Sequence, residues 1–396
     1  MSPAAALTHP APGWLAERLR AAGGSVPFHT YMEWALHDPE HGAYGSGRLQ
    51  VGPCGDFATS PSLGPDFAEL LAPQLAQWLQ ALPGPEPLAL VEAGPGEGDL
   101  ALQLAQALQR HWPELAARTE LVLIEPNPGM AARQRALLAD TPLPCRWLSF
   151  EQLAQQPVRG VLLAHEVLDA LAVERIVWDG ALWRRQRVAL HEDPAAGPSL
   201  RLEPGEPLEP AMAAQLEPLG LVPAGGQRQP GWCTELHPGL GSWLQQAASA
   251  LSDGALLVID YAHEAWRYYA PQRSNGTLMA YRQQLASDDP LQEPGHWDLT
   301  AHLCIESVEA AAQQQGWYPL GQRRQGEALL ALGLAQRLHG LQQQPGVHLD
   351  ALLSRREALL RLVDPHALGD FRWLAFQRQG AAALPAALFL QDPPLA

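Results

Sequence analysis

An alternation of short apolar runs with segments of helical periodicity, between residues 88 and 165, limits the fold of this chain more than any other feature. Continuously apolar strands joined by helical crossovers are typical of a parallel sheet that helices cover on both faces. We therefore predict an α/β protein built on a Rossmann-like sheet. Strands are expected at 88–93, 120–125, 145–148 and 160–165, and crossover helices at 99–110 and 129–139.

The sequence on either side of this pattern divides the chain into four segments. Residues 1–85 predict a helical N-terminal section with a lid-like loop. Residues 86–177 form the first half of the Rossmann-like domain. Residues 178–233 combine alternating strands with a Pro/Gly-rich stretch and predict an inserted α+β subdomain. Residues 234–396 return to the α/β pattern and supply the second half and a C-terminal strand.

A glycine-rich turn, Glu92-Ala-Gly94-Pro-Gly96-Glu-Gly98, joins the first predicted strand to its helix. Glycine lacks a Cβ, so the backbone of such a turn can approach a bound ligand closely. A dinucleotide fingerprint would place the third glycine one residue later. The acid before the turn favours S-adenosyl-L-methionine (SAM), because a carboxylate can bind the ammonium of its amino-acid part. The plain alternative is a structural turn.

Glu125 ends the next apolar run, and Pro126 follows it. An acid about 20 residues beyond a glycine turn commonly accepts the hydroxyls of an adenosine ribose. We assign both residues to the cofactor site, the alternative being a solvated glutamate at a strand end.

Composition excludes several enzyme classes. All 26 basic residues are arginine, so the chain has no lysine for a Schiff base or for phosphate binding in a P-loop or a kinase. The net charge of −16 argues against binding of bulk nucleic acid.

No apolar run reaches the roughly 20 residues that a membrane span needs. The start of the chain has no targeting pattern, so a cytoplasmic location is expected. The His and Cys spacing indicates no metal site, and nothing indicates the oligomeric state.

Further blocks of sequence follow a known order along almost the whole chain. The block 55–61 contains Asp56, Phe57, Thr59 and Ser60, and later blocks lie at 164–171, 258–261, 276–282, 289–291 and 294–302. Together they resemble the SAM-dependent methyltransferases of the MidA type, whose mitochondrial members are complex I assembly factors. The resemblance implies a protein arginine methyltransferase that acts on a subunit of respiratory complex I. Val167, Leu168 and Ala172 depart from the two aromatics and the proline usual in the second block, which changes the predicted acceptor pocket.

Two carboxylates follow the strand predicted at 160–165. Open α/β sheets bind ligands beyond the carboxyl ends of their strands, where Glu166 and Asp169 are expected. Carboxylates can hold and orient a guanidinium, which is planar and always charged. We predict Glu166 and Asp169 as the catalytic residues, the alternative for Asp169 being a helix cap.

Two other groups of residues are candidates for the same site. Asp56, Phe57, Thr59 and Ser60 are predicted to close over the cofactor as part of a lid, or else to form a plain polar turn. Asp260 and Tyr261, at the end of the strand expected at 255–261, are candidates for the wall of an acceptor channel or for a structural pair.

These features predict direct in-line transfer of a methyl group from SAM to an arginine of a partner protein, with no covalent enzyme intermediate. Two alternatives stay open, a SAM-binding assembly chaperone with little turnover and a small-molecule O- or N-methyltransferase. A NAD-dependent reductase is less favoured because of the glycine spacing.

Overall fold

A computed structural model describes residues 9–49, 52, 59–85, 87–221, 228–341, 348–378, 380 and 383–394. The chain divides into two units, and each is assembled from several stretches of sequence. Unit 1 comprises Met1–Gln50, Asp169–Leu240 and His263–Ser307, and unit 2 comprises Val51–Leu168, Gly241–Ala262 and Val308–Ala396. These borders do not coincide with the four continuous segments predicted from the sequence, which remain a prediction.

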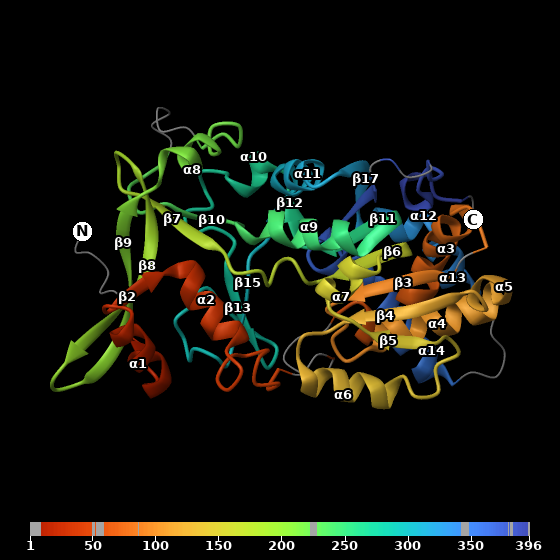
Figure 1. Cartoon of the computed structure of the whole chain (residues 1–396), viewed down its shortest axis with the longest axis horizontal. Helices are drawn as coiled ribbons and strands as arrows, with labels where there is room; N and C mark the ends of the chain where they lie inside the picture. The colour runs from red at the N-terminus through yellow and green to blue at the C-terminus, as the bar shows by residue number, and fades with distance from the viewer. Residues whose placement is uncertain are drawn as a thin grey trace. The chain divides into compact units, whose positions relative to one another are not determined.

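Unit 2 contains a seven-stranded sheet with the order β17-β18-β11-β6-β3-β4-β5 (Figure 1). Five neighbouring strands are parallel, and β18 runs antiparallel to both β11 and β17. The strands are β3 (Leu88–Ala93), β4 (Thr119–Ile124), β5 (Cys145–Trp147), β6 (Val158–His165), β11 (Leu251–Asp260), β17 (Trp317–Arg324) and β18 (Arg372–Arg378). The predicted Rossmann-like α/β class is therefore confirmed.

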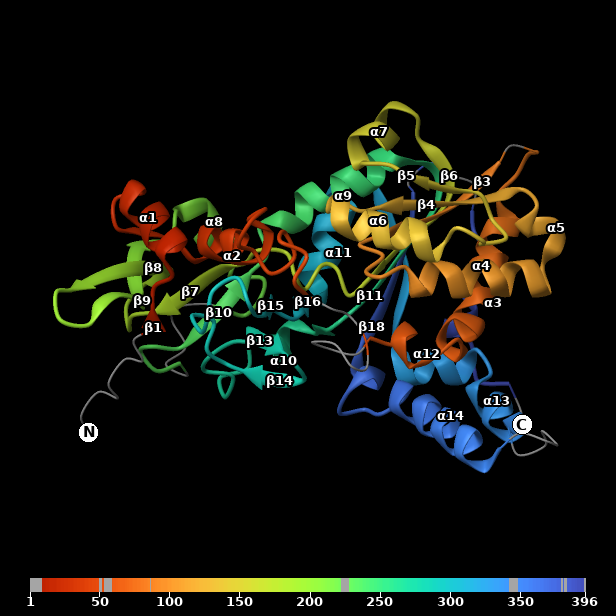
Figure 2. The ribbon, with the colours of Figure 1, turned by 90° about the horizontal axis from the view of Figure 1, so that it is seen from below.

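Helices cover both faces of this sheet, which is why β3 is buried along its whole length. One face packs alternate strand residues such as Leu90, Leu123 and Leu163 against the largest apolar core of the unit. Figures 1 and 2 show α6, α7 and α9 on the opposite face from α3, α12, α13 and α14. The helices are α3 (Asp66–Ala81), α4 (Asp99–His111), α5 (Pro113–Ala116), α6 (Pro128–Leu137), α7 (Phe150–Gln155), α9 (Gly239–Ala250), α11 (Ile305–Gln314), α12 (Gln325–Ala331), α13 (Leu334–Leu341) and α14 (Leu349–Leu362).

The strand order reverses at β3. The chain leaves β3 through α4 to reach β4 on one side, whereas β6 pairs with the other side of β3. In open α/β sheets, a reversal of this kind leaves a crevice at the carboxyl ends of the strands, and ligands bind there. The glycine turn after β3, Glu125 after β4 and Glu166 after β6 all follow strands that end at this edge.

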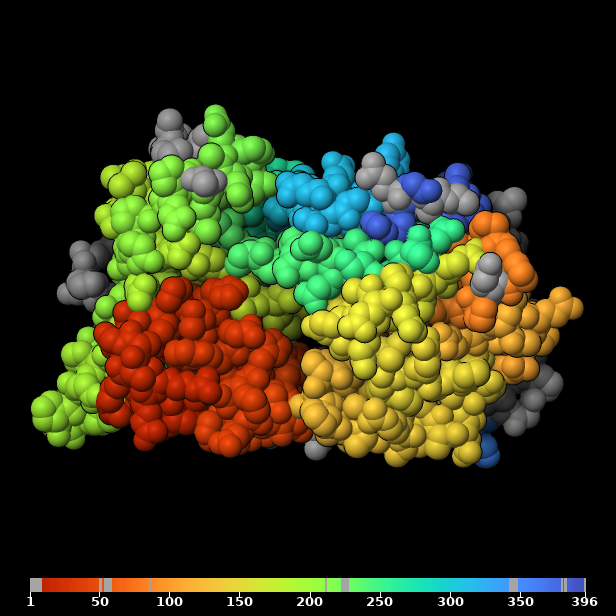
Figure 3. All heavy atoms as spheres, in the orientation of Figure 1, coloured from red at the N-terminus to blue at the C-terminus, as the bar shows by residue number. Residues whose placement is uncertain are grey.

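Unit 1 consists mainly of antiparallel strands and the N-terminal helices. One sheet has the order β1-β9-β8-β7-β10, with β2 paired to β8, and another has the order β14-β13-β15. Helices α1 (Gly13–Ala21) and α2 (Phe28–His37) pack on the first sheet through an apolar core that includes Leu19, Tyr31 and Val188, and they form one continuous surface, red in Figure 3. The strands are β1 (His9–Pro10), β2 (Ser25–Pro27), β7 (Glu174–Trp178), β8 (Trp183–Asp193), β9 (Gly197–Pro207), β10 (Cys233–Leu236), β13 (Met279–Arg282), β14 (Leu285–Ser287) and β15 (Asp298–Thr300).

Short elements complete the chain: α1 (Gly13–Ala21), α2 (Phe28–His37), α8 (Pro210–Ala214), α10 (Ala265–Tyr268), β12 (Ala262–His263), β16 (Leu303–Cys304) and 3₁₀ turns at Pro61–Leu63, Leu368–Asp370 and Leu388–Leu390. Helices α9 and α11 each begin in unit 1 and continue in unit 2. Among the helices that the structure describes, none is long and apolar enough to cross a membrane.

Candidate functional site

The glycine turn after β3 has a backbone conformation that favours glycine. Gly94, Gly96 and Gly98 all have positive φ, at 62°, 55° and 99°. The Gly94 N–H donates to the carbonyl of Ile124 at 3.0 Å, which fixes the start of the turn to the end of β4. A Cβ on Gly94 would lie 2.8 Å from Cγ2 of Val167, so the turn packs directly against the loop that follows β6.

Glu92 has a buried carboxyl group beside this turn. It is 6% exposed, and its Oε2 has no hydrogen-bond partner among the described residues. Burial, with a smaller contribution from the charge of Asp99, raises the pKa of Glu92 to about 8. Buried polar atoms in folded proteins almost always have a partner, so an unsatisfied one at a ligand edge indicates a place for a ligand donor.

Glu125 follows β4 and has a fixed carboxylate. Its Oε1 accepts the N–H of Asn127 at 2.8 Å, and its Oε2 accepts Nε2 of Gln134 at 3.0 Å. Burial raises the pKa of Glu125, although these hydrogen bonds act in the opposite direction. Pro126 is exposed beside it.

The sheet register places these two acids at one edge. Glu92 lies opposite Leu123, and Ala93 lies opposite Ile124, so Glu125 follows at the level where the glycine turn begins. A buried carboxyl group with an unsatisfied oxygen, a turn with three glycines and a second, oriented carboxylate fit SAM. Glu92 suits its ammonium, Glu125 suits its ribose hydroxyls, and the glycines allow the close approach that both contacts need.

Glu166 begins the loop after β6 in an unusual backbone conformation. Its φ is 54°, a value that non-glycine residues seldom adopt and that is concentrated at functional sites. The Glu166 N–H donates to the carbonyl of Ile259 at 2.9 Å, so the conformation is held by the neighbouring strand. Next to it, burial lowers the pKa of His165 to about 3, so this imidazole is neutral at pH 7.

Asp260 anchors the same loop. Its Oδ2 accepts the N–H groups of Val167 at 3.2 Å and Leu168 at 3.0 Å, and its Oδ1 accepts the N–H of Tyr261 at 2.8 Å. Asp260 is fully buried, so we interpret it as a support of the loop rather than as a channel wall. Tyr261 is half-buried and packs edge-on against Phe371, with ring centroids 4.0 Å apart.

Asp169 belongs to the other unit, because the chain passes from unit 2 to unit 1 after Leu168. Asp169 is 4% exposed, and its backbone carbonyl accepts the N–H of Ala301 at 2.9 Å. Burial raises the pKa of Tyr281, and the charge of Asp169 raises it further. The shared catalytic role of Glu166 and Asp169 stays a prediction.

Two of the predicted lid residues, Asp56 and Phe57, lie outside the described residues. The other two are buried: Thr59 hydrogen-bonds to Ser62 through its N–H and its carbonyl, and Oγ of Ser60 accepts Nε2 of Gln325 at 3.1 Å. Their contribution to the cofactor site stays a prediction.

Phe67, at the start of α3, locates the segment with Thr59 and Ser60 relative to the sheet. Its ring packs against His165 with ring centroids 5.3 Å apart, so the beginning of α3 lies near the carboxyl end of β6. The segment that carries Thr59 and Ser60 thus runs into the edge of the sheet where the glycine turn lies.

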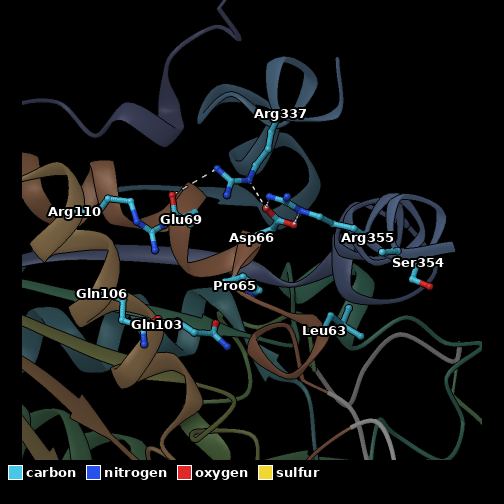
Figure 4. A pocket seen from close by; sticks show the side chains of 11 residues that line it. Leu63, Pro65, Asp66, Glu69, Gln103, Gln106, Arg110, Arg337, Ser354 and Arg355 are labelled. Atoms are coloured by element: carbon cyan, nitrogen blue, oxygen red, sulfur yellow. Dashed lines mark hydrogen bonds and ion pairs between the residues drawn. The ribbon is translucent and has the colours of Figure 1, made fainter. Parts of the chain in front are cut away.

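A second polar cluster lines a cavity of about 590 Å³ formed by residues of α3, α4, α13 and α14 (Figure 4). Asp66 accepts hydrogen bonds from Arg337 and Arg355, and Glu69 forms an ion pair with Arg110 at 2.5 Å. Each carboxylate in this cavity is already paired with arginine, so the cluster ties α13 and α14 to α3. No group of His, Cys, Asp and Glu within the described ranges could hold a metal ion.

Gln134 was not predicted as a residue of this site. This residue is fully buried in α6 and hydrogen-bonds to Gly96, Glu125 and Trp147. No motif marks it, and the only signal in the sequence is a polar residue on a helix next to an acidic strand end.

Curated relatives match most of the chain. It is 28% identical to the "Protein arginine methyltransferase NDUFAF7 homolog, mitochondrial" of Drosophila melanogaster, with 92% of this chain and 84% of that protein covered. It is 26% identical to the human "Protein arginine methyltransferase NDUFAF7, mitochondrial", with 88% and 78% covered.

These names contradict the expected cytoplasmic location, since they describe mitochondrial proteins. That expectation was wrong because it rested on the composition of the first residues, which does not determine a compartment.

A solved structure and a family model agree with the fold. The crystal structure of a protein from Burkholderia thailandensis, bound to S-adenosyl-homocysteine, matches 98% of this chain and 99% of that chain, with 30% identity and a TM-score of 0.81. Residues 70–323 match the family described as "Putative S-adenosyl-L-methionine-dependent methyltransferase". The glycine turn, Glu92, Glu125 and the loop after β6 all lie within the matched residues, and the chain belongs to this family of SAM-dependent methyltransferases.

Proposed function

We propose that this methyltransferase transfers the methyl group of SAM to a guanidinium nitrogen of an arginine in a partner protein. The observation that carries the proposal is the position of Glu166. It is held at positive φ after β6, and the next residue, Val167, packs on Gly94 of the glycine turn. Glu166 is therefore adjacent in the chain to the residue that packs on the glycine turn, and in this proposal that turn approaches the methyl donor. The names of the curated relatives support arginine as the acceptor.

The cofactor contacts below are part of this proposal. Glu92 binds the ammonium of SAM, Glu125 accepts hydrogen bonds from its ribose hydroxyls, and the turn from Gly94 to Gly98 lies against it. When bound, SAM supplies an electrophilic methyl group on a sulfonium. The chain's own residues bind and orient both reactants, which provides most of the rate enhancement in such a displacement.

Glu166 and Asp169 act on the acceptor in this proposal. Their carboxylates pair with the guanidinium and orient one nitrogen toward the methyl group. The nitrogen–methyl bond forms as the sulfur–methyl bond breaks, S-adenosyl-homocysteine is released, and the methylated nitrogen loses one proton to water. Neutral His165 adds no positive charge that would repel the guanidinium.

The family resemblance also leads us to propose a subunit of respiratory complex I as the partner. The acidic balance of the chain, with a net charge of −16, suits a basic segment that presents an arginine.

The test begins with binding. Isothermal titration of the purified protein with SAM and with NADH should show binding of SAM alone, and failure to bind SAM would refute the cofactor site. Labelled SAM is then incubated with complex I fractions and with a lysate, and the labelled residue is identified by amino-acid analysis. Methylarginine in a single protein supports the proposal. Label in small molecules indicates a small-molecule methyltransferase, and SAM binding without any label indicates an assembly chaperone.

Variants then test the acceptor residues. Glu166→Gln and Asp169→Asn should each reduce methyl transfer by about 100-fold, since each removes a charge that holds the acceptor cation. Both should keep their affinity for S-adenosyl-homocysteine within about twofold. Glu151→Gln, which alters an exposed glutamate of α7, serves as the control. Unchanged transfer in the first two variants would contradict their assignment.

A further inference from the structure

Gln134 connects three parts of the cofactor site that are far apart in the sequence. Its Nε2 donates to the carbonyl of Gly96 at 2.7 Å and to Oε2 of Glu125 at 3.0 Å. Its Oε1 accepts Nε1 of Trp147, on β5, at 2.9 Å. The side chain is fully buried, so water does not compete for these hydrogen bonds.

The chemistry of its partners fixes which way the amide of Gln134 points. The indole N–H of Trp147 can only donate, and the Gly96 carbonyl and an ionised Glu125 can only accept. With the opposite orientation of the amide, oxygen would face oxygen at two contacts and N–H would face N–H at the third. The three partners therefore favour one orientation of the amide, and Trp147 contributes to it as the donor to Oε1.

This arrangement prepares Glu125 for a ligand. Asn127 holds Oε1 and Gln134 holds Oε2, so both carboxylate oxygens are fixed before a ligand arrives. Each carboxylate oxygen can accept a second hydrogen bond. Fixing a binding group in advance lowers the entropy that binding costs.

We propose that Gln134 is a positioning residue of the cofactor site. It aims the Glu125 carboxylate at the two ribose hydroxyls of the cofactor and fixes the Gly96 carbonyl, so that recognition of the ribose depends on it. The inference rests on the proposed role of Glu125 in binding the ribose.

The experiment compares two ligands, S-adenosyl-homocysteine and its 2′,3′-dideoxyribose analogue, by isothermal titration. Their affinity ratio measures recognition of the ribose hydroxyls. A hydrogen bond to a charged group contributes about 1.5–3 kcal/mol, so we expect a ratio of about 100-fold or more in the wild type. Gln134→Met keeps the length of the side chain and removes the amide, and the ratio should fall about tenfold.

Gln74→Met is the matched control. Gln74 is also a fully buried glutamine of unit 2, and it hydrogen-bonds to Gln77 and to the N–H of Phe389. Its substitution should lower the thermal unfolding temperature, as Gln134→Met does, but should leave the affinity ratio unchanged. If Gln134→Met weakens both ligands equally, its role is only structural and the inference is wrong.

Two further variants distinguish a wrong inference on Gln134 from a wrong assignment of Glu125. Trp147→Phe removes the indole N–H that contributes to the orientation of the amide, and it should lower the affinity ratio about threefold. An unchanged ratio would contradict the orienting role, even where Gln134→Met does not fold. Glu125→Gln tests the proposed role of Glu125 in binding the ribose, on which the inference depends. If the full ratio persists in this variant, Glu125 does not bind the ribose. If Glu125→Gln abolishes the ratio and the Gln134 and Trp147 variants keep it, only the inference on Gln134 fails.

Discussion

Replacing Glu92 by glutamine should stabilise the protein and weaken its cofactor binding at the same time. Glu92 is buried and protonated at pH 7 in the folded free protein, because burial and Asp99 raise its pKa to about 8. In the unfolded chain it ionises near its ordinary pKa of 4.5. The folded state therefore binds more protons, and stability falls as the pH rises from 4.5 to 8.

The size of the stability change follows from these values. At pH 7, which is about 2.5 pH units above the ordinary pKa, keeping Glu92 protonated costs about 3 kcal/mol at 1.36 kcal/mol per unit. A glutamine side chain does not titrate, so Glu92→Gln should be more stable than the wild type by up to this amount at pH 7. The two proteins should unfold alike near pH 4. Urea unfolding at both values of pH measures the difference.

The same proton must leave when a cationic ammonium binds. At pH 7 about nine-tenths of Glu92 is protonated, so binding of S-adenosyl-homocysteine should release about 0.9 protons. Affinity should rise about tenfold between pH 6 and pH 7, and the gain should end near pH 8, where the ligand's own amine begins to lose its proton. Glu92→Gln should release no proton and bind about tenfold more weakly at pH 8.

Titration calorimetry in buffers of different ionisation enthalpy counts the protons directly. A count near zero at pH 7, together with equal affinity at pH 6 and pH 7, would refute the contact between Glu92 and the ammonium. A variant that is no more stable at pH 7 than at pH 4, relative to the wild type, would refute the raised pKa.

Three other substitutions test the surroundings of the site. Gly94→Ala places a Cβ 2.8 Å from Val167 at a positive φ, so affinity for S-adenosyl-homocysteine should fall at least tenfold by titration, while Gly241→Ala, at a glycine with open space around it, should have no effect. Asp260→Asn weakens the support of the loop after β6, so we expect kcat to fall tenfold and cofactor affinity to change less than threefold. A tenfold loss of cofactor affinity with kcat changed less than threefold would contradict the anchoring role. Burial raises the pKa of Asp66, but the hydrogen bonds and charges of Arg355 and Arg337 outweigh burial and lower it below 3.8. Asp66→Asn should therefore cost about 2 kcal/mol in urea unfolding at pH 7, and this loss should shrink as the pH falls from 3.8 through the lowered pKa; a loss that does not shrink with falling pH would exclude the ion pairs as the cause.

The sequence predicts the buried elements of unit 2 well and its edge poorly. Strand β3 was expected at the residues where it occurs, because burial on both faces makes all its side chains except Glu92 apolar. Strand β17 was not predicted. It lies at the edge of the sheet, it contains Pro319 and Gly321 at a shift of register, and most of its side chains are half-buried, so neither an apolar run nor a strict alternation marks it.

The apolar spacing at 327–338 is typical of one helix, but the structure has two, α12 and α13. Gly333, with φ of 96°, ends α12 and allows α13 to start in a new direction. Periodicity alone does not detect this break, since the apolar spacing continues across it.

Some residues of the candidate site could be predicted from the sequence, and others could not. Glu92, the glycines and Glu125 are local to strand ends and could be found from the motif. Gln134 acts through contacts with residues 96, 125 and 147, and the assembly of unit 1 from three separated stretches also depends on long-range contacts. A single sequence shows no pattern that pairs such distant residues.

The order of strands at the β17 edge affects how the chain can fold during synthesis. β17 precedes β18 in the chain, yet it pairs with β18 and reaches the sheet only through it. Until residue 378 has been made, β11 keeps an open edge of unpaired backbone groups, and β17 has no place to dock. A nascent chain therefore carries an aggregation-prone edge from the synthesis of β11 onward, and a truncation that removes Arg372 and all later residues would leave that edge permanently exposed.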